Sequence, residues 1–177
     1  MPAERLSDTS YAVLGLLDLF EPATPYQLKQ IAQVSIFHFW SIPHTQLYTE
    51  CERLAKAGLL DERREEGGRR RRIYRLSSAG RRALREWRAD PHADLYELRD
   101  PGLLKLFCGA DPASLAEAQL ERHERRLHSY EQLLAQADMP EGMRLALESG
   151  IGHEREYVRF WSRLARGGAA GAERRSA

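Results

Sequence analysis

One β-hairpin in an otherwise helical sequence is the feature that most limits what this chain of 177 residues can fold into. The runs 59–66 and 69–76 have the character of short strands, and Gly67-Gly68 lies between them. Two strands joined by a glycine tip are typical of a β-hairpin. The other segments with apolar periodicity indicate helices, so we expect a mainly α fold with a small β-hairpin.

Two helices are predicted at the start of the chain. Residues 8–20 place apolar side chains at helical spacing, with Ser7 or Asp8 as the N-cap. A second helix should begin near Thr24, with Pro25 in its first turn. Both helices are expected to serve the packing of a core.

A third helix is predicted over residues 43–57, where Pro43 opens it and Gly58 supplies the C-terminal cap. Its inward stripe is Leu47, Cys51 and Leu54, and its opposite side is polar. The connection before it, residues 34–42, is bulky rather than polar. We expect its aromatic residues to wedge between helices; they are Phe37, Phe39 and Trp40.

A fourth helix is predicted directly after the hairpin, over residues 78–89. Ser77 caps it, and Leu84 and Trp87 lie on its expected buried side. Three helices, a hairpin and a capped helix, in this order, form the plan of a winged helix-turn-helix domain, which we place at residues 1–90. In that plan the third helix, the recognition helix, enters the major groove, and the hairpin, or wing, lies against the DNA backbone or in the minor groove.

The candidate DNA contacts lie on the recognition helix and on the wing at residues 67–72. Short polar side chains on a helix face can reach base edges. Arginines that follow a glycine tip can place their guanidinium groups against phosphates. The candidates inferred in this way are His44, Thr45, Gln46, Thr49, Arg69, Arg70, Arg71 and Arg72.

The second half of the chain has helical periodicity from Leu95 to Arg166. A short helix, a long helix after Pro112 and a final helix are predicted, and Met139-Pro140 separates the last two. The apolar stripe of the final helix is broader than one short neighbour can cover, so residues 91–167 are expected to be an α-helical dimerisation domain, followed by a disordered tail over 168–177. The expected interface is Leu120, Leu127, Tyr130, Met143, Leu147, Ile151, Tyr157, Val158, Trp161 and Leu164.

The sequence also resembles the PadR family of transcriptional regulators. That family has a tyrosine in its recognition helix, and a Tyr-x-Leu-Thr-x-x-Gly segment closes its wing. Here Ser77 replaces the threonine and keeps the hydroxyl cap. The Phe-Trp pair and the long helical second half are most similar to the virulence-activator branch. The residues that carry the resemblance are Phe39-Trp40, Tyr48, Leu54, Gly58-Leu59, Tyr74-Arg75-Leu76-Ser77 and Gly80.

This resemblance implies a homodimer that presents two winged domains to a palindromic operator in double-stranded DNA. It maps a phosphate-contacting tyrosine onto Tyr48 and a basic wing onto residues 69–72. Repression is the expected role, although the branch includes activators. The resemblance also implies a small aromatic ligand as a further partner; Trp87, Phe107 and Trp161 are candidates that packing explains equally well.

Three alternatives remain beside this interpretation. A winged-helix module for protein interaction or assembly, without specific DNA binding, would need the arginines to be neutralised, and Glu62, Glu65 and Glu66 could do part of this. The MarR type shares the fold and the dimer, and Asp61-Glu62-Arg63 loosely matches its wing. An enzyme is disfavoured, since the sequence has neither H-E-x-x-H nor G-x-S-x-G, and Gly67-Gly68 is not followed by Gly-Lys-Ser/Thr.

Composition adds few constraints. The net charge is +1, so DNA affinity must come from where the charges lie rather than from their total. Cys51 and Cys108 are expected to be buried and unpaired, and no metal or cofactor is indicated. His123 is expected to be a core or interface histidine with a hydrogen-bond partner. With no signal peptide and no membrane-spanning run, the expected location is cytoplasmic.

Overall fold

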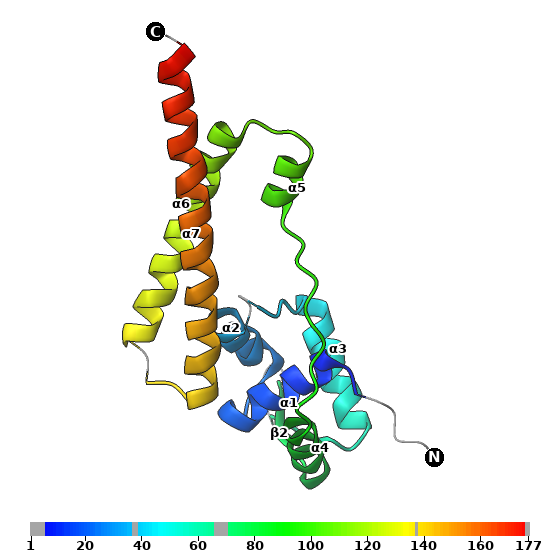
Figure 1. Ribbon diagram of the computed structural model, residues 1–177. Helices are drawn as coiled ribbons and strands as arrows, with labels where there is room; N and C mark the ends of the chain where they lie inside the picture. Colours follow the sequence, from blue (N-terminus) through cyan, green and yellow to red (C-terminus); the bar gives the residue numbers. More distant parts are fainter. Residues whose placement is uncertain (1–5, 37–38, 66–70, 137, 176–177) are drawn as a thin grey trace. The chain divides into compact units, whose positions relative to one another are not determined.

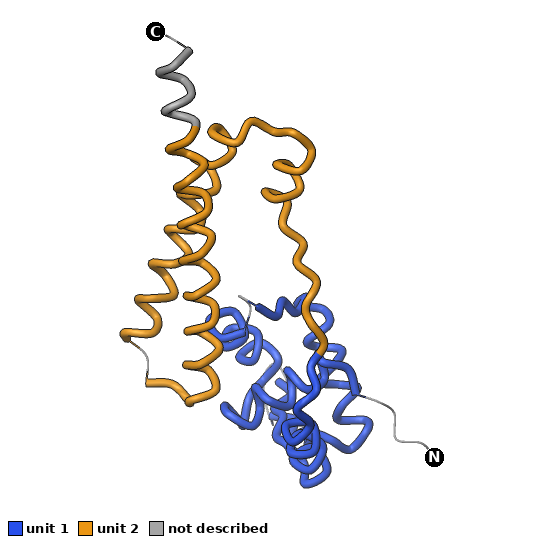
Figure 2. The backbone as a smooth tube through the Cα atoms, viewed as in Figure 1, with its two compact units in different colours: residues 1–93 blue, residues 94–177 orange. Residues whose placement is uncertain are grey.

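The computed structural model describes residues 6–36, 39–65, 71–136 and 138–175, and of residues 168–175 only the backbone (Figure 1). It divides into two compact units, residues 1–93 and 94–177 (Figure 2). Helices account for most of the described chain, together with one antiparallel pair of strands. The predicted fold class is therefore confirmed.

Unit 1 contains four helices and the hairpin in the predicted order. Helix α1 is capped by Ser7, α2 by Thr24 and α4 by Ser77, because each hydroxyl accepts a hydrogen bond from a backbone N–H of the first helical turn. Gly58 follows α3 with a φ of +73°, a conformation that suits a residue without a Cβ. The elements are α1 (Asp8–Phe20), α2 (Pro25–Ser35), α3 (His44–Lys56), β1 (Leu60–Arg64), β2 (Arg72–Leu76) and α4 (Ser78–Ala89).

One hydrophobic core holds unit 1 together. It takes residues from every element, because each helix turns an apolar stripe inward and β2 contributes alternate side chains. Leu47, Cys51 and Leu54 of α3 are buried in it, as predicted, and Tyr74 of β2 is fully buried. The outward side of α3 is consequently left facing solvent.

Three predictions about the packing of bulky and cysteine side chains are wrong. Phe39 and Trp40 do not wedge into the core, since their side chains are exposed. Trp87 is 45% exposed; one face of its ring stacks on Tyr11 of α1, with ring centroids 4.8 Å apart, and the ring does not enter the core. Cys108 is exposed, whereas Cys51 is buried as expected. Phe37 lies outside the described residues.

Unit 2 is built from three helices: α5 (Pro101–Phe107), α6 (Pro112–Gln136) and α7 (Glu141–Arg175). The predicted helical character from Leu95 onward is wrong for its first residues, because 91–100 form neither helix nor strand. Asp100 begins α5 by accepting hydrogen bonds from two backbone N–H groups. Helix α7 continues past Gly167 to Arg175, and the disordered tail stays a prediction.

Helices α6 and α7 pack along each other and bury part of the stripe that was assigned to a dimer interface. Leu147, Ile151 and Trp161 are at most 4% exposed within the single chain. The neighbour of α7 is longer than expected, because α6 has 25 residues and can cover more of the apolar stripe than a short helix could. A Cβ on Gly102 would lie 3.2 Å from the Trp161 ring, so α5 closes this core from a third side.

His123 of α6 has its hydrogen-bond partner inside the same unit. Its Nδ1 lies 2.6 Å from Oε2 of Glu154, and its ring stacks on Tyr157 of α7. The hydroxyl of Tyr157 hydrogen-bonds to Asp100, and burial is the main cause that raises the pKa of Tyr157 to about 12. The prediction of a packed, partnered histidine is confirmed.

Across the described helices, none carries an apolar stretch that could cross a bilayer.

Candidate nucleic-acid interface

Helix α3 presents a polar face beside a buried one. His44, Thr45, Gln46, Tyr48 and Thr49 are all exposed, because the core residues Leu47, Cys51 and Leu54 fix the rotation of the helix. The N-cap of α3 is Pro43, whose side chain accepts no hydrogen bond. The first backbone N–H groups of the helix therefore lack a side-chain cap and can donate to an acceptor from another molecule. The Thr49 hydroxyl donates to the backbone oxygens of Thr45 and Gln46.

A partly buried ion pair on α3 connects this helix with α1. Nε and Nη2 of Arg53 donate to the two carboxylate oxygens of Glu50 at 3.0 and 2.7 Å, and Nη2 also lies 2.9 Å from Oγ of Ser10. Arg53 thereby lowers the pKa of Glu50 below its ordinary value. This contact was missed from the sequence, although a spacing of three residues on a helix is a usual one for an ion pair.

The wing is hydrogen-bonded to the segment just before α2. Tyr74 of β2 exchanges two backbone hydrogen bonds with Ala23, at 2.9 and 3.2 Å, and its hydroxyl donates to Glu62 of β1 at 3.2 Å. The strands pair from Leu60 with Leu76 to Arg64 with Arg72. This register places Arg72 at the outer end of the paired strands, where its side chain meets Glu52 of α3.

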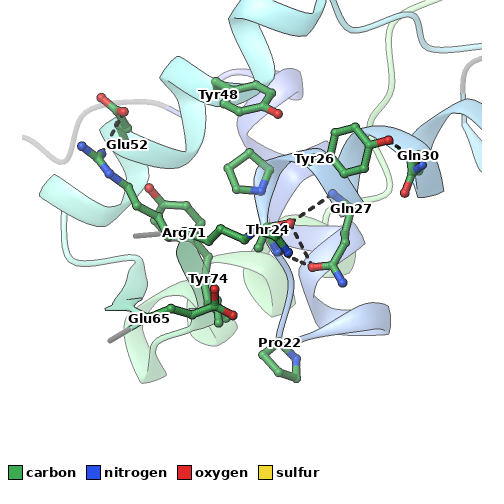
Figure 3. Close-up of a pocket in the computed structure, with 13 residues that line it drawn as sticks. Pro22, Thr24, Tyr26, Gln27, Gln30, Tyr48, Glu52, Glu65, Arg71 and Tyr74 are labelled. Atoms are coloured by element: carbon green, nitrogen blue, oxygen red, sulfur yellow. Dashed lines mark hydrogen bonds and ion pairs between the residues drawn. The ribbon is translucent and has the colours of Figure 1, made fainter. Parts of the chain in front are cut away.

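Between α2, α3 and the wing lies a groove of about 950 Å³ (Figure 3). Tyr48 and Glu52 border it from α3, and Arg71 borders it from the wing. The start of α2 forms the remaining side, where Thr24 and Gln27 cap the helix reciprocally. The lining residues are Pro22, Thr24, Pro25, Tyr26, Gln27, Gln30, Tyr48, Glu52, Glu65, Arg71, Arg72, Ile73 and Tyr74.

The arginines of the wing have different surroundings. Arg71 is exposed at the groove. Nη1 of Arg72 lies 2.8 Å from Oε1 of Glu52 and 3.7 Å from Oε2 of Glu62, so this side chain is already paired with carboxylates. Arg69 and Arg70 lie outside the described residues. The structure thus brings Arg71, Arg72 and Tyr48 to one groove.

Sequence reasoning missed the contribution of α2. Tyr26 is 56% exposed at the groove, and its hydroxyl accepts a hydrogen bond from Nε2 of Gln30. Gln27 lies on the same side of the helix. The signal in the sequence is the pair of polar residues Gln27 and Gln30, which lie beside the inward positions Leu28 and Ile31, whereas the helical spacing alone predicts only core packing for α2.

The winged unit resembles known transcriptional regulators in sequence. A sequence model of the transcriptional regulator PadR-like family matches residues 13–86, which span α1 to α4 apart from their ends. Over these residues the chain is similar to PadR-like transcriptional regulators. The negative transcriptional regulator PadR of Bacillus subtilis is 27% identical over 165 residues, which cover 84% of this chain and 90% of that protein.

Two solved structures show the same fold over both units of this PadR-like chain. The crystal structure of Bacillus subtilis PadR in complex with operator DNA has a TM-score of 0.78 and 23% identity, covering 90% of this chain and 99% of that one. The Vibrio cholerae virulence activator AphA has a TM-score of 0.65 and 22% identity, covering 92% and 98%. The predicted PadR resemblance is confirmed, and assignment to the virulence-activator branch stays a prediction.

Proposed function

We propose that this PadR-like chain is a transcriptional regulator that binds double-stranded operator DNA sequence-specifically. In this proposal α3 enters the major groove, where His44, Thr45, Gln46 and Thr49 face the bases or the backbone. Tyr48 and the arginines of the wing contact phosphates on either side. The observation that carries the proposal is the polar, exposed face of α3, which lies beside a groove bordered by Arg71 and the start of α2.

We propose a homodimer, because a palindromic operator requires two copies of α3 related by a two-fold axis. Within the single chain, Leu120, Leu127, Met143 and Leu164 are only partly buried. Unit 2 also exposes large apolar side chains, a common mark of an interaction surface. They are Leu95, Tyr96, Leu98, Leu104, Phe107 and Leu145. Leu147, Ile151 and Trp161 support the fold of the protomer instead.

Repression and response to a small aromatic ligand are the further parts of the proposal. The Bacillus subtilis relative is named a negative regulator and has been solved with operator DNA and with p-coumaric acid. For this chain we propose the same sign of regulation and the same broad class of ligand. Catalysis is not part of the proposal, and the proposed place of action is the cytoplasm, where bacterial operator DNA is found.

Fluorescence anisotropy of the purified chain tests the proposal. Duplexes would come from the region upstream of its own gene and, if these fail, from a selection of bound genomic fragments; a random duplex of equal length is the control. We expect operator binding about a thousandfold tighter than binding to the random duplex. Gln46→Ala should narrow that margin, while Gln33→Ala on the exposed side of α2 should not. Equal, weak binding of every fragment would favour the protein-interaction module instead.

A further inference from the structure

The groove proposed to receive DNA contains carboxylates as well as arginines. Glu52, on the third turn of α3, borders it, and so does Glu65 at the end of the wing strand (Figure 3). A DNA backbone presents phosphates to such a groove, so each carboxylate opposes binding through like charge. Glu52 is therefore unfavourable for phosphate binding at this position, unless it has another role there.

The geometry shows that Glu52 is directed at one cation. Its Oε1 lies 2.8 Å from Nη1 of Arg72, across the gap between α3 and β2. Glu62 is a more distant partner of the same nitrogen at 3.7 Å, and it already accepts hydrogen bonds from Arg64 and from the Tyr74 hydroxyl. Glu52 is therefore the main carboxylate that occupies Arg72.

The pair is placed so that a phosphate can compete for it. The side chains of Arg72 and Glu52 are 39% and 46% exposed, and an ion pair so open to water contributes little to stability. Arg72 stays protonated at any physiological pH, and its pKa is raised further by its hydrogen bond with Tyr74 and by Glu52 and Glu62. A phosphate that takes Nη1 of Arg72 competes with Glu52 for that nitrogen and brings a second negative charge beside the carboxylate.

We propose that Glu52 restrains sequence-independent DNA binding by occupying Arg72, so that one arginine of the wing is withheld from the phosphate backbone. The inference rests on the proposed function and deepens it, since it names a residue that sets affinity for DNA in general. Sequence-independent binding draws nearly all of its free energy from phosphate contacts. Release of a single arginine should therefore be measurable on a random duplex.

The test uses four full-length proteins: the wild type, Glu52→Gln, Arg72→Gln and the double variant. Their affinity for a random duplex is measured by anisotropy between 50 and 200 mM salt. We expect Glu52→Gln to bind more tightly and to show a salt slope steeper by about 0.9, which is an additional loss of about three- to fourfold across that range. In the Arg72→Gln background, Glu52→Gln should leave the slope unchanged and give only the small gain in affinity that comes from removing a like charge.

Glu86→Gln is the matched control, because Glu86 is an exposed glutamate of unit 1 on α4. It changes the net charge by the same amount and should leave the slope unchanged. The inference is overturned if Glu86→Gln tightens binding as much as Glu52→Gln, or if the Glu52→Gln gain persists in full without Arg72. Failure of all four proteins to bind any duplex at 50 mM salt would instead refute the proposed function, and this inference with it.

Discussion

Glu50 and Arg53 form a closed pair in which one guanidinium satisfies both oxygens of one carboxylate and also reaches Ser10 on another helix. Glu50 is only 9% exposed, so the pair lies at the boundary of the core rather than on the open surface. It lies between the polar face of α3 and the N-terminal turn of α1. The orientation of the proposed recognition helix therefore depends on a charged contact as well as on apolar packing.

We predict that Glu50→Gln lowers the free energy of unfolding by about 1.5–3 kcal/mol at pH 7, because a charge-assisted hydrogen bond to Arg53 is lost. The pKa of Glu50 is held below its ordinary value of 4.5. The ionised form therefore stabilises the fold fully above that value, and the contribution disappears as the pH falls through the lower folded pKa. Urea denaturation at pH 7 and at pH 3.5 should show the gap between wild type and variant shrink at the lower pH. A gap of equal size at both values would contradict the prediction.

Substitution by alanine should have opposite effects on the stability of the fold at two glycines of unit 1. A Cβ on Gly80 would collide with the backbone oxygen of Leu59, at the junction of the wing and α4, whereas a Cβ on Gly15 of α1 meets nothing within 4 Å. Gly80→Ala should cost about 3 kcal/mol or more, because backbone atoms cannot move aside as a flexible side chain can. Gly15→Ala should stabilise the chain by up to about 1 kcal/mol through helix propensity. Thermal unfolding followed by circular dichroism measures both, and a similar melting temperature for the two variants would be evidence against this account.

Local features of unit 1 were predictable because they depend on neighbouring residues. Ser7, Thr24 and Ser77 act as helix caps through bonds to the residue three positions on, and Gly58 closes α3 through its own backbone. The polar face of α3 followed from helical spacing alone. These features need no knowledge of which elements meet in space.

Contacts between distant elements were not predictable in the same way. The Glu52–Arg72 pair depends on how the hairpin lies against α3, and the burial of Trp161 depends on α6 and α5 packing around α7. Phe39, Trp40 and Cys108 were expected inside because of their side-chain type, yet the chain around them leaves them exposed. Residue type indicates a preference for burial, while the arrangement of helices decides whether that preference is met.

Arg71 has no ion-pair partner among the described residues and should therefore bind a DNA phosphate directly. It is exposed at the groove, unlike Arg72, which Glu52 occupies. We predict that Arg71→Gln weakens binding to random and operator duplexes alike and reduces the salt slope by about 0.9, the value for one phosphate contact. Arg85→Gln, an exposed arginine on α4, is the control and should leave the slope as it is. An unchanged slope for Arg71→Gln would mean that this arginine does not contact phosphate.

The exposed apolar residues of α5 offer a test of the dimer that leaves the protomer intact. Leu104 is 61% exposed and Phe107 is 89% exposed, so aspartate at both positions removes little packing from unit 2. Trp161 is unsuitable for this purpose, because it is fully buried and a charge there would disrupt the fold itself. We predict that the double variant sediments as a monomer while its helical circular dichroism is retained. Leu19→Asp, at an exposed position of α1, is the control and should remain dimeric. A double variant that stays dimeric would exclude Leu104 and Phe107 as essential residues of the interface.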